Sequence, residues 1–221
     1  MSLETIQASV EVKPCPARIP GFVDAVERAA GALILIAASP VIAASAVTIS
    51  ILSRRSPFIA HQRVGEGGES LWVWKLRTMW TRQAAYPYER GWVEYIVADA
   101  PGGAKNPSDS RVTSRFAKFV RRHSIDELPQ LWHVARGEMS LVGPRPLTRA
   151  EIARYYGDRA AELLSVKPGI TGIWQTRGRS EVKFPERAAM DLELVNGLTP
   201  RIYVSILLRT LPALFHGKGA W

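Results

Sequence analysis

One stretch limits the folds open to this chain more than any other: residues 29–52 contain no charged side chain. They read AAGALILIAASPVIAASAVTISIL, and as a helix these 24 residues would extend about 36 Å at roughly 1.5 Å per residue. A helix of that length can cross the hydrocarbon core of a bilayer with some tilt. We favour insertion into a membrane, with a buried core helix as the alternative.

Ser39 and Pro40 lie near the middle of this stretch. Proline removes a backbone donor and clashes with the preceding turn, so the helix should bend there. A kinked span and a hairpin that re-enters the same leaflet are both compatible with the sequence. Basic residues flank the stretch on both sides, which favours both ends staying in the cytoplasm. They are Lys13, Arg18 and Arg28 before it and Arg54, Arg55 and Arg63 after it.

The charge composition points to anionic partners. The chain has 29 Lys and Arg residues against 20 Asp and Glu residues, a formal net charge of +9, so nucleic acid, lipid headgroups and phosphorylated metabolites all qualify. Its only cysteine, Cys15, excludes an internal disulfide and fits a reducing compartment. The four histidines lack paired metal-ligand spacing, so we do not expect a zinc site.

We divide the chain into a flexible arm (1–21), a membrane-inserted segment (22–55) and a cytoplasmic domain (56–221). The expected class is α+β and mainly helical. A short β-hairpin is predicted over residues 57–81, and a surface loop rich in proline and glycine over residues 82–108. Helices are predicted near 112–122, 125–136, 149–164, 184–196 and 201–215, of which the first and last suit a membrane interface.

The segment before the acidic pair Asp126–Glu127 carries basic residues at helical spacing, namely Arg111, Arg115, Lys118 and Arg122. The pair itself has two interpretations. Ser124 and Glu127 match a capping box, which would make the acidic residues helix caps. An aspartate held ionised among arginines can also attack phosphorus or coordinate a hard cation. These two interpretations do not exclude each other.

Further cations gather in segments of unusual composition. Lys75 and Arg77 alternate with apolar neighbours and are predicted to share one face of a strand. Arg145 stands between Pro144 and Pro146, which lowers the entropy cost of positioning its guanidinium. The segment 166–180 combines three glycines with Lys167, Arg177 and Arg179, a pattern that suits a phosphate pocket.

Several motifs, taken in order, resemble those of the bacterial sugar transferases, the monotopic polyprenyl-phosphate phosphoglycosyl transferases. They cover the chain from about residue 22 to its end, and as a set they are highly specific. The motifs are the apolar segment with Ser39-Pro40, KLRTM (75–79), DSRVT (109–113), SIDELPQLW (124–132), GEMSLVGPRP (137–146) and KPGITGIWQTRGR (167–179).

The resemblance implies that a sugar 1-phosphate passes from a nucleotide diphosphate sugar, typically a UDP-sugar, to a polyprenyl phosphate such as undecaprenyl phosphate. It implies Mg²⁺ as cofactor, membrane lipid as a partner, and no role for nucleic acid. It places the catalytic domain on the cytoplasmic face of the bacterial inner membrane. It also implies that the apolar helix breaks at Ser39-Pro40 and returns to the cytoplasmic leaflet.

Matched motif by motif, Asp126 would be the nucleophile of a covalent phosphosugar intermediate, and Glu127 its partner in metal coordination. Substrate and phosphate binding would fall to Lys75, Arg121, Arg145, Arg179 and Asp191, and the strand pattern adds Arg77 to this set.

The chain departs from the family pattern at a few positions, and Ser180 after Gly178-Arg179, where asparagine is usual, bears on donor preference. A second hypothesis is a non-catalytic, membrane-tethered basic module that binds anionic lipid or nucleic acid. That module gives no reason for an acidic pair among arginines. The sequence leaves open the sugar, the nucleotide, the lipid chain, the pathway and whether the chain forms a homodimer.

Overall fold

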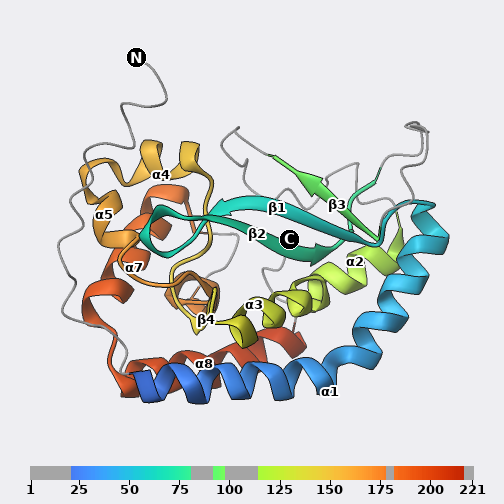
Figure 1. Cartoon of the computed structure of the whole chain (residues 1–221), viewed down its shortest axis with the longest axis horizontal. Coiled ribbons are helices and arrows are strands. Elements are labelled where there is room, and N and C mark those ends of the chain that lie inside the picture. The colour runs from blue at the N-terminus through green and yellow to red at the C-terminus, as the bar shows by residue number, and fades with distance from the viewer. Residues whose placement is uncertain (1–20, 81–91, 98–113, 178–181, 217–221) are drawn as a thin grey trace.

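The computed structural model describes residues 21–80, 92–97, 114–177 and 182–216, so the predicted arm lies almost entirely outside the described residues. The expected class, α+β and mainly helical, is confirmed (Figure 1). The helices are α1 (Gly21–Ser53), α2 (Arg115–Arg122), α3 (Leu131–Arg136), α4 (Arg149–Tyr155), α5 (Ala160–Leu163), α6 (Ile173–Arg177), α7 (Phe184–Gly197) and α8 (Pro200–His216). The strands are β1 (Phe58–Val64), β2 (Ser70–Leu76), β3 (Val93–Ile96), β4 (Ser140–Val142) and β5 (Gly169–Thr171).

Helix α1 contains the uncharged stretch and is long and apolar enough to cross a membrane. The bend predicted from Pro40 is confirmed, since α1 bends near its middle (Figure 1). The break at Ser39-Pro40 that the family resemblance implies is wrong for this chain, because α1 continues through Pro40. Pro40 cannot donate to the carbonyl of Ile36, and the hydroxyl of Ser39 donates to that oxygen instead, at 2.8 Å. The replaced hydrogen bond explains why the helix bends without ending.

The predicted hairpin forms from β1 and β2, which pair antiparallel with Ile59 opposite Lys75 and His61 opposite Val73. A third strand, β3, pairs parallel to β1 at the other edge. The prediction of a surface loop over 82–108 is therefore wrong for Val93–Ile96. The rest of that loop lies outside the described residues, apart from Trp92 and Val97.

The acidic pair lies in a 3₁₀ turn, η3 (Ile125–Gln130), that leads into α3. The predicted capping box is wrong, because Ser124 adopts the left-handed region (φ 55°) and its side chain caps nothing. Helix α2 begins at Arg115, later than predicted, and its cap is Ser114, whose Oγ accepts from the amide of Ala117 at 2.9 Å. The turn η3 packs against β2, α1, α2 and α3.

The parallel pair β4–β5 packs against α8, and β4 also packs against α1 and α3. The single helix predicted over 149–164 is divided into α4 and α5 at Gly157, which has a positive φ of 49°. Apolar residues of α4, α5 and α7 form one core with Val64, and residues of β4, α6, α7 and α8 form another. The α7 and α8 predictions are confirmed to within a few residues.

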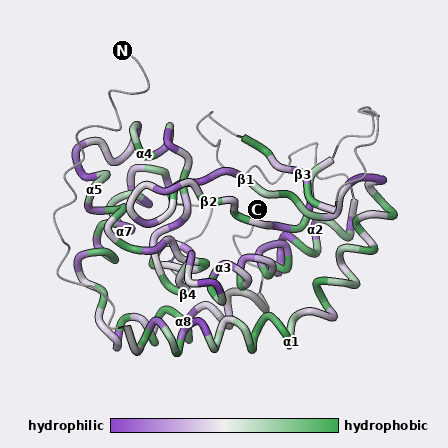
Figure 2. The backbone as a smooth tube through the Cα atoms, in the orientation of Figure 1, coloured by the Kyte–Doolittle hydropathy of each residue, from purple (hydrophilic) through white to green (hydrophobic). Residues whose placement is uncertain are grey.

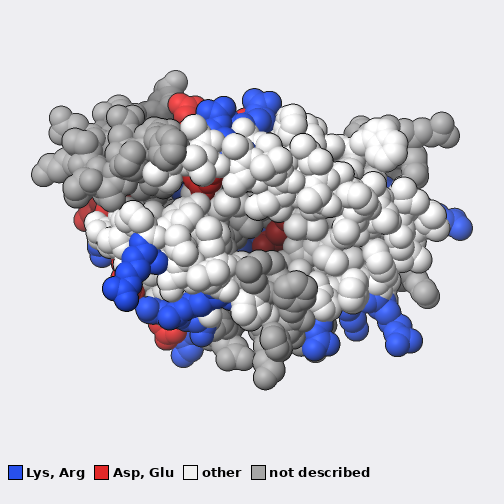
Figure 3. All heavy atoms as spheres, turned by 90° about the horizontal axis from the view of Figure 1, so that it is seen from below, with Lys and Arg blue, Asp and Glu red and all other residues white. Residues whose placement is uncertain are grey.

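Helices α1 and α8 run along the same side of the molecule (Figure 1). Large apolar side chains of both helices are exposed there, including Leu33, Ile36 and Ile51 of α1 and Val204 and Leu208 of α8. Figure 2 shows the apolar character of α1 along most of its length. Seen from below, this side is broadly uncharged, and most Lys and Arg side chains lie at its margins (Figure 3).

Candidate active site

A cleft opens between one face of the hairpin β1–β2, the turn η3 and the loop that follows β4. Its empty volume is about 340 Å³. Three of its polar lining residues, Arg63, Lys75 and Arg145, are cations, and Glu127 is the only carboxylate among the lining residues. The lining residues are His61, Arg63, Val73, Lys75, Glu127, Gln130, Arg145, Pro146, Gly169 and Ile170.

Lys75 and Glu127 form an ion pair in this cleft. The Nζ atom of Lys75 lies 2.8 Å from Oε1 of Glu127, and the two side chains are 18% and 19% exposed. The pair links β2 to η3, two elements that pack closely together. Their partial burial makes the pair stronger than a surface ion pair and leaves both groups reachable from solvent.

Arg63 and His61 were not among the site residues predicted from the sequence. Both lie on β1 opposite Leu71 and Val73 of β2, and Ile59 on the same strand lies opposite Lys75, so these side chains share the face of Lys75. Their place in the cleft becomes apparent only from the register of β1 against β2. From the sequence of β1 alone, His61 and Arg63 cannot be distinguished from strand residues whose side chains face solvent.

The cleft concentrates positive charge. The pKa of His61 is lowered to about 4, first by burial and then by the charges of Arg63, Lys75, Arg145 and Arg77, in that order. Burial also lowers the pKa of Arg63, with the charge of Arg145 as the next cause. Like charges brought together in a partly buried cleft favour an anionic ligand, which would relieve their mutual repulsion.

Asp126 lies beside this cleft but does not line it. Its exposed fraction is 6%, whereas the next residue, Glu127, reaches into the cleft. The turn η3 thus presents its two carboxylates differently, one buried and one at the cleft wall. A role in chemistry requires that the donor substrate gain access to Asp126.

Two further predicted cations lie near the cleft without lining it. Arg121, at the end of α2, donates from Nη1 to Oγ1 of Thr78 at 3.2 Å, which ties it to the segment after β2. Arg77 is 5% exposed, donates from Nε to the carbonyl of Ser56 at 2.7 Å and pairs with Glu94 at 2.5 Å. Arg77 therefore connects β3 to the hairpin and does not line the cleft, although the strand register places it on the same face of the sheet as Lys75.

Arg145 is the member of the predicted set that joins the cleft to the helices behind it. Its guanidinium carbon lies 5.6 Å from the ring centroid of Trp174, and that of Arg187 lies 4.6 Å from the same ring. Asp191 of α7 is 1% exposed and accepts a hydrogen bond from the hydroxyl of Tyr156 at 2.9 Å. Burial raises the pKa of Asp191 to about 7, although Tyr156 and the charges of Arg145 and Arg187 act against that shift.

The described part of the glycine-rich segment 166–180 makes packing contacts and also lines the cleft through Gly169 and Ile170. Lys167 pairs with Asp24 of α1, and Arg177 lies 3.9 Å from Glu193. A Cβ on Gly169 would lie 2.0 Å from the amide nitrogen of Gly143, so glycine is needed where β5 begins beside the end of β4. Arg179 lies outside the described residues.

Among the described residues, no group of three or more His, Cys, Asp or Glu side chains is placed to hold a metal ion. The cleft still contains the carboxylate of Glu127. Mg²⁺ characteristically uses one or two protein carboxylates together with waters and substrate phosphates, so this donor set fits Mg²⁺ bound with a phosphorylated substrate.

Comparison with known proteins bears on the whole chain. The sequence profile described as "Bacterial sugar transferase" matches residues 21–217. A relative from Sinorhizobium fredii, "Exopolysaccharide production protein ExoY", is 34% identical over 86% of this chain and 83% of its own length. A relative from Caulobacter vibrioides, "UDP-glucose:undecaprenyl-phosphate glucose-1-phosphate transferase", is 34% identical over 87% of this chain and 69% of its own length.

Another relative, the "UDP-galactose-lipid carrier transferase" of Erwinia amylovora, is 37% identical over 75% of this chain. The match spans only 35% of that relative's length. The chain thus corresponds to about a third of some relatives and to most of others.

Proposed function

Since the chain belongs to the bacterial sugar transferase family, we propose that it transfers a sugar 1-phosphate from a nucleotide diphosphate sugar to a polyprenyl phosphate. The products are a polyprenyl diphosphate sugar and a nucleoside monophosphate. The names of two relatives, which mention UDP-glucose, UDP-galactose and undecaprenyl phosphate, favour a UDP-sugar donor and an undecaprenyl acceptor. Such a reaction would begin the assembly of a polysaccharide or glycoconjugate.

The observation that carries the proposal is the cationic cleft with a single lining carboxylate. A diphosphate brings at least two negative charges, and Arg63, Lys75 and Arg145 offer charge to match them. The arginine forks suit phosphate oxygens, while Lys75 adds a point charge next to Glu127. A site built for a neutral ligand would not need this concentration of cations.

The proposed chemistry has two displacements at one phosphorus atom. In the first, an Asp126 carboxylate oxygen bonds to the phosphorus that bears the sugar, and the bond from that phosphorus to the bridging oxygen breaks, which releases nucleoside monophosphate. In the second, a phosphate oxygen of the polyprenyl phosphate bonds to the same phosphorus, and the bond to Asp126 breaks. The carboxylate is regenerated, so charge and atoms balance over the cycle.

Asp126 is buried before this reaction, so the first displacement requires that donor binding make its carboxylate reachable from the cleft. Glu127 and the substrate phosphates would hold Mg²⁺, which supplies neutralisation of the charge that develops on the phosphate oxygens. Lys75 keeps Glu127 oriented in the cleft through their 2.8 Å contact. Arg145 binds and orients the diphosphate from the opposite wall.

The apolar side of the molecule supports its insertion into a membrane. The exposed apolar residues of α1 and α8, bordered mainly by Lys and Arg (Figure 3), would lie in the cytoplasmic leaflet of the inner membrane with the basic rim at the headgroups. We propose that the bend of α1 returns it to that leaflet. The cleft would then stand near the level at which the acceptor's phosphate resides.

Release of nucleoside monophosphate from a panel of nucleotide sugars tests this function, with and without polyprenyl phosphate and Mg²⁺. The expected result is turnover that needs all three components and one preferred donor. Affinity for nucleic acid or anionic vesicles without turnover of any donor would favour the non-catalytic basic module instead.

A further inference from the structure

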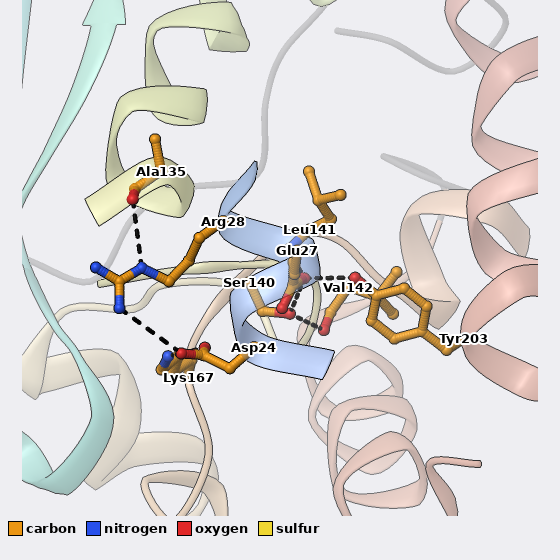
Figure 4. Close-up of polar contacts among 9 residues, drawn as sticks. All are labelled: Asp24, Glu27, Arg28, Ala135, Ser140, Leu141, Val142, Lys167 and Tyr203. Carbon is orange, nitrogen blue, oxygen red and sulfur yellow. Dashed lines mark hydrogen bonds and ion pairs between the residues drawn. The ribbon is translucent and has the colours of Figure 1, made fainter. Parts of the chain in front are cut away.

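The first turns of α1 carry a carboxylate that the proposed reaction does not use. Glu27 is 6% exposed, although much of α1 faces outward. Its Oε1 accepts hydrogen bonds from Oγ of Ser140 at 2.6 Å and from the amide of Leu141 at 2.5 Å. The hydroxyl of Tyr203 on α8 donates to the same oxygen (Figure 4). Glu27 thus joins α1, β4 and α8 at one point.

A buried carboxylate is costly unless several donors compensate for its lost hydration. Here three donors face it, namely the hydroxyls of Ser140 and Tyr203 and the amide of Leu141, and the Ser140 hydroxyl also lies 2.9 Å from the carbonyl oxygen of Val142. The pKa of Tyr203 is raised, first by burial and then by the hydrogen bond to Glu27, so its hydroxyl remains a donor. An apolar residue would fill this place at lower cost if α1 only needed to pack. The arrangement therefore indicates a requirement for fixed geometry at the start of β4.

The segment from this contact to Arg145 has little freedom to move. The amide of Gly143 donates to the carbonyl of Thr171 at 2.9 Å, and that of Gly169 donates to the carbonyl of Pro144 at 2.7 Å. Gly143 and Gly169 approach so closely that neither accommodates a side chain. A displacement at Leu141 is therefore passed along β4 to Arg145, four residues later.

We propose that Glu27 is a positioning residue that couples the seating of α1 in the membrane to the placement of Arg145 in the cleft. A shift of α1 relative to the bilayer would move Glu27, then β4, then the guanidinium. Of the two measurements that test this proposal, the activity measurement rests on the proposed function and the hydrogen-exchange measurement does not.

Glu27→Gln is the informative variant because it keeps the size of the side chain. Its amide brings two donors into a place already filled with donors, and its oxygen accepts more weakly than a carboxylate. Arg28→Gln is the matched control. Arg28 is the next residue of α1, but its Nε donates to the carbonyl of Ala135 near the end of α3, at 3.4 Å, and its Nη1 lies 3.9 Å from Asp24 of α1. None of its described interactions involves β4.

Hydrogen exchange of the full chain in lipid nanodiscs forms the first arm. Glu27→Gln should speed amide exchange in residues 140–147 and 167–172 by about tenfold, with residues 58–76 unchanged and Arg28→Gln like the wild type. Exchange that rises equally everywhere, or only within α1, overturns the inference, because it reports global or purely local loosening.

The second arm is a double-mutant cycle with Arg145→Lys, read as the rate of nucleoside monophosphate release. Glu27→Gln should lower that rate about tenfold, and the double variant should lose clearly less than the product of the single losses. If the loss of rate in the double variant equals the product of the two single losses, the inference is overturned, since residues that act independently give that result. If the wild type turns over no donor, the proposed function fails while the exchange arm still decides the role of Glu27.

Discussion

Nζ of Lys75 lies 2.8 Å from Oε1 of Glu127, so the second strand of the hairpin is tied to the turn that carries the acidic pair. We expect Lys75→Gln and Glu127→Gln each to lower turnover by at least about tenfold, because each removes a charge that would face the diphosphate and the metal ion of the proposed reaction. The double variant should remain impaired. Recovery of activity in the double variant would mean that the pair only neutralises itself. Lys118→Gln, an exposed site on α2, is the control.

The close approach of Gly169 to Gly143 predicts a stability defect. The Cβ of Gly169→Ala would lie 2.0 Å from a backbone nitrogen, so we expect a loss of about 1–3 kcal/mol or more, measured as thermal unfolding in detergent. Gly197→Ala is the matched control, because no atom lies within 4 Å of its added Cβ. Equal stabilities of the two variants would contradict the close packing of β4 against β5.

His61 predicts a pH dependence of stability. Its pKa is lowered from 6.5 to about 4, first by burial, so below pH 6.5 the unfolded chain binds a proton that the folded protein does not. This residue therefore makes stability fall as the pH drops from 6.5 toward 4, and contributes no slope above that range. His61→Gln should show a shallower loss of unfolding temperature over the same interval. Parallel curves for the two proteins would exclude this role.

The topology proposed for α1 places both of its ends in the cytoplasm. In a Cys15→Ser background, cysteines introduced by Val10→Cys and by Glu69→Cys, an exposed site near the hairpin turn, should both resist an impermeant thiol reagent in intact cells. Both should react after the membrane is permeabilised. Labelling of the N-terminal cysteine alone in intact cells would establish a full span.

The sequence predicts elements whose signals are local. Uncharged length identified α1, and alternation with a glycine turn identified β1 and β2. Strand β3 was missed because it has only four residues between segments rich in proline and glycine, and its pairing with β1 is distant in sequence. The capping box failed because it needs an extended residue at the cap, and Ser124 is left-handed.

The candidate site was predicted in part for the same reason. Motif matching found Lys75, Glu127 and Arg145, which the fold brings together in one cleft from distant parts of the sequence. It did not find Arg63 and His61, because their place in the cleft depends on the register of β1 against β2. The burial of Asp126 and the separate engagement of Arg77 follow from packing that no local pattern encodes.

In the proposed reaction Asp126 carries the sugar phosphate. Incubating the protein with its preferred nucleotide sugar and Mg²⁺, without acceptor, and then measuring intact and peptide mass tests it most directly. The account predicts an adduct of one sugar phosphate on the peptide that contains Asp126, discharged by polyprenyl phosphate and absent from Asp126→Asn. An adduct on Glu127, or full turnover by Asp126→Asn, would contradict it.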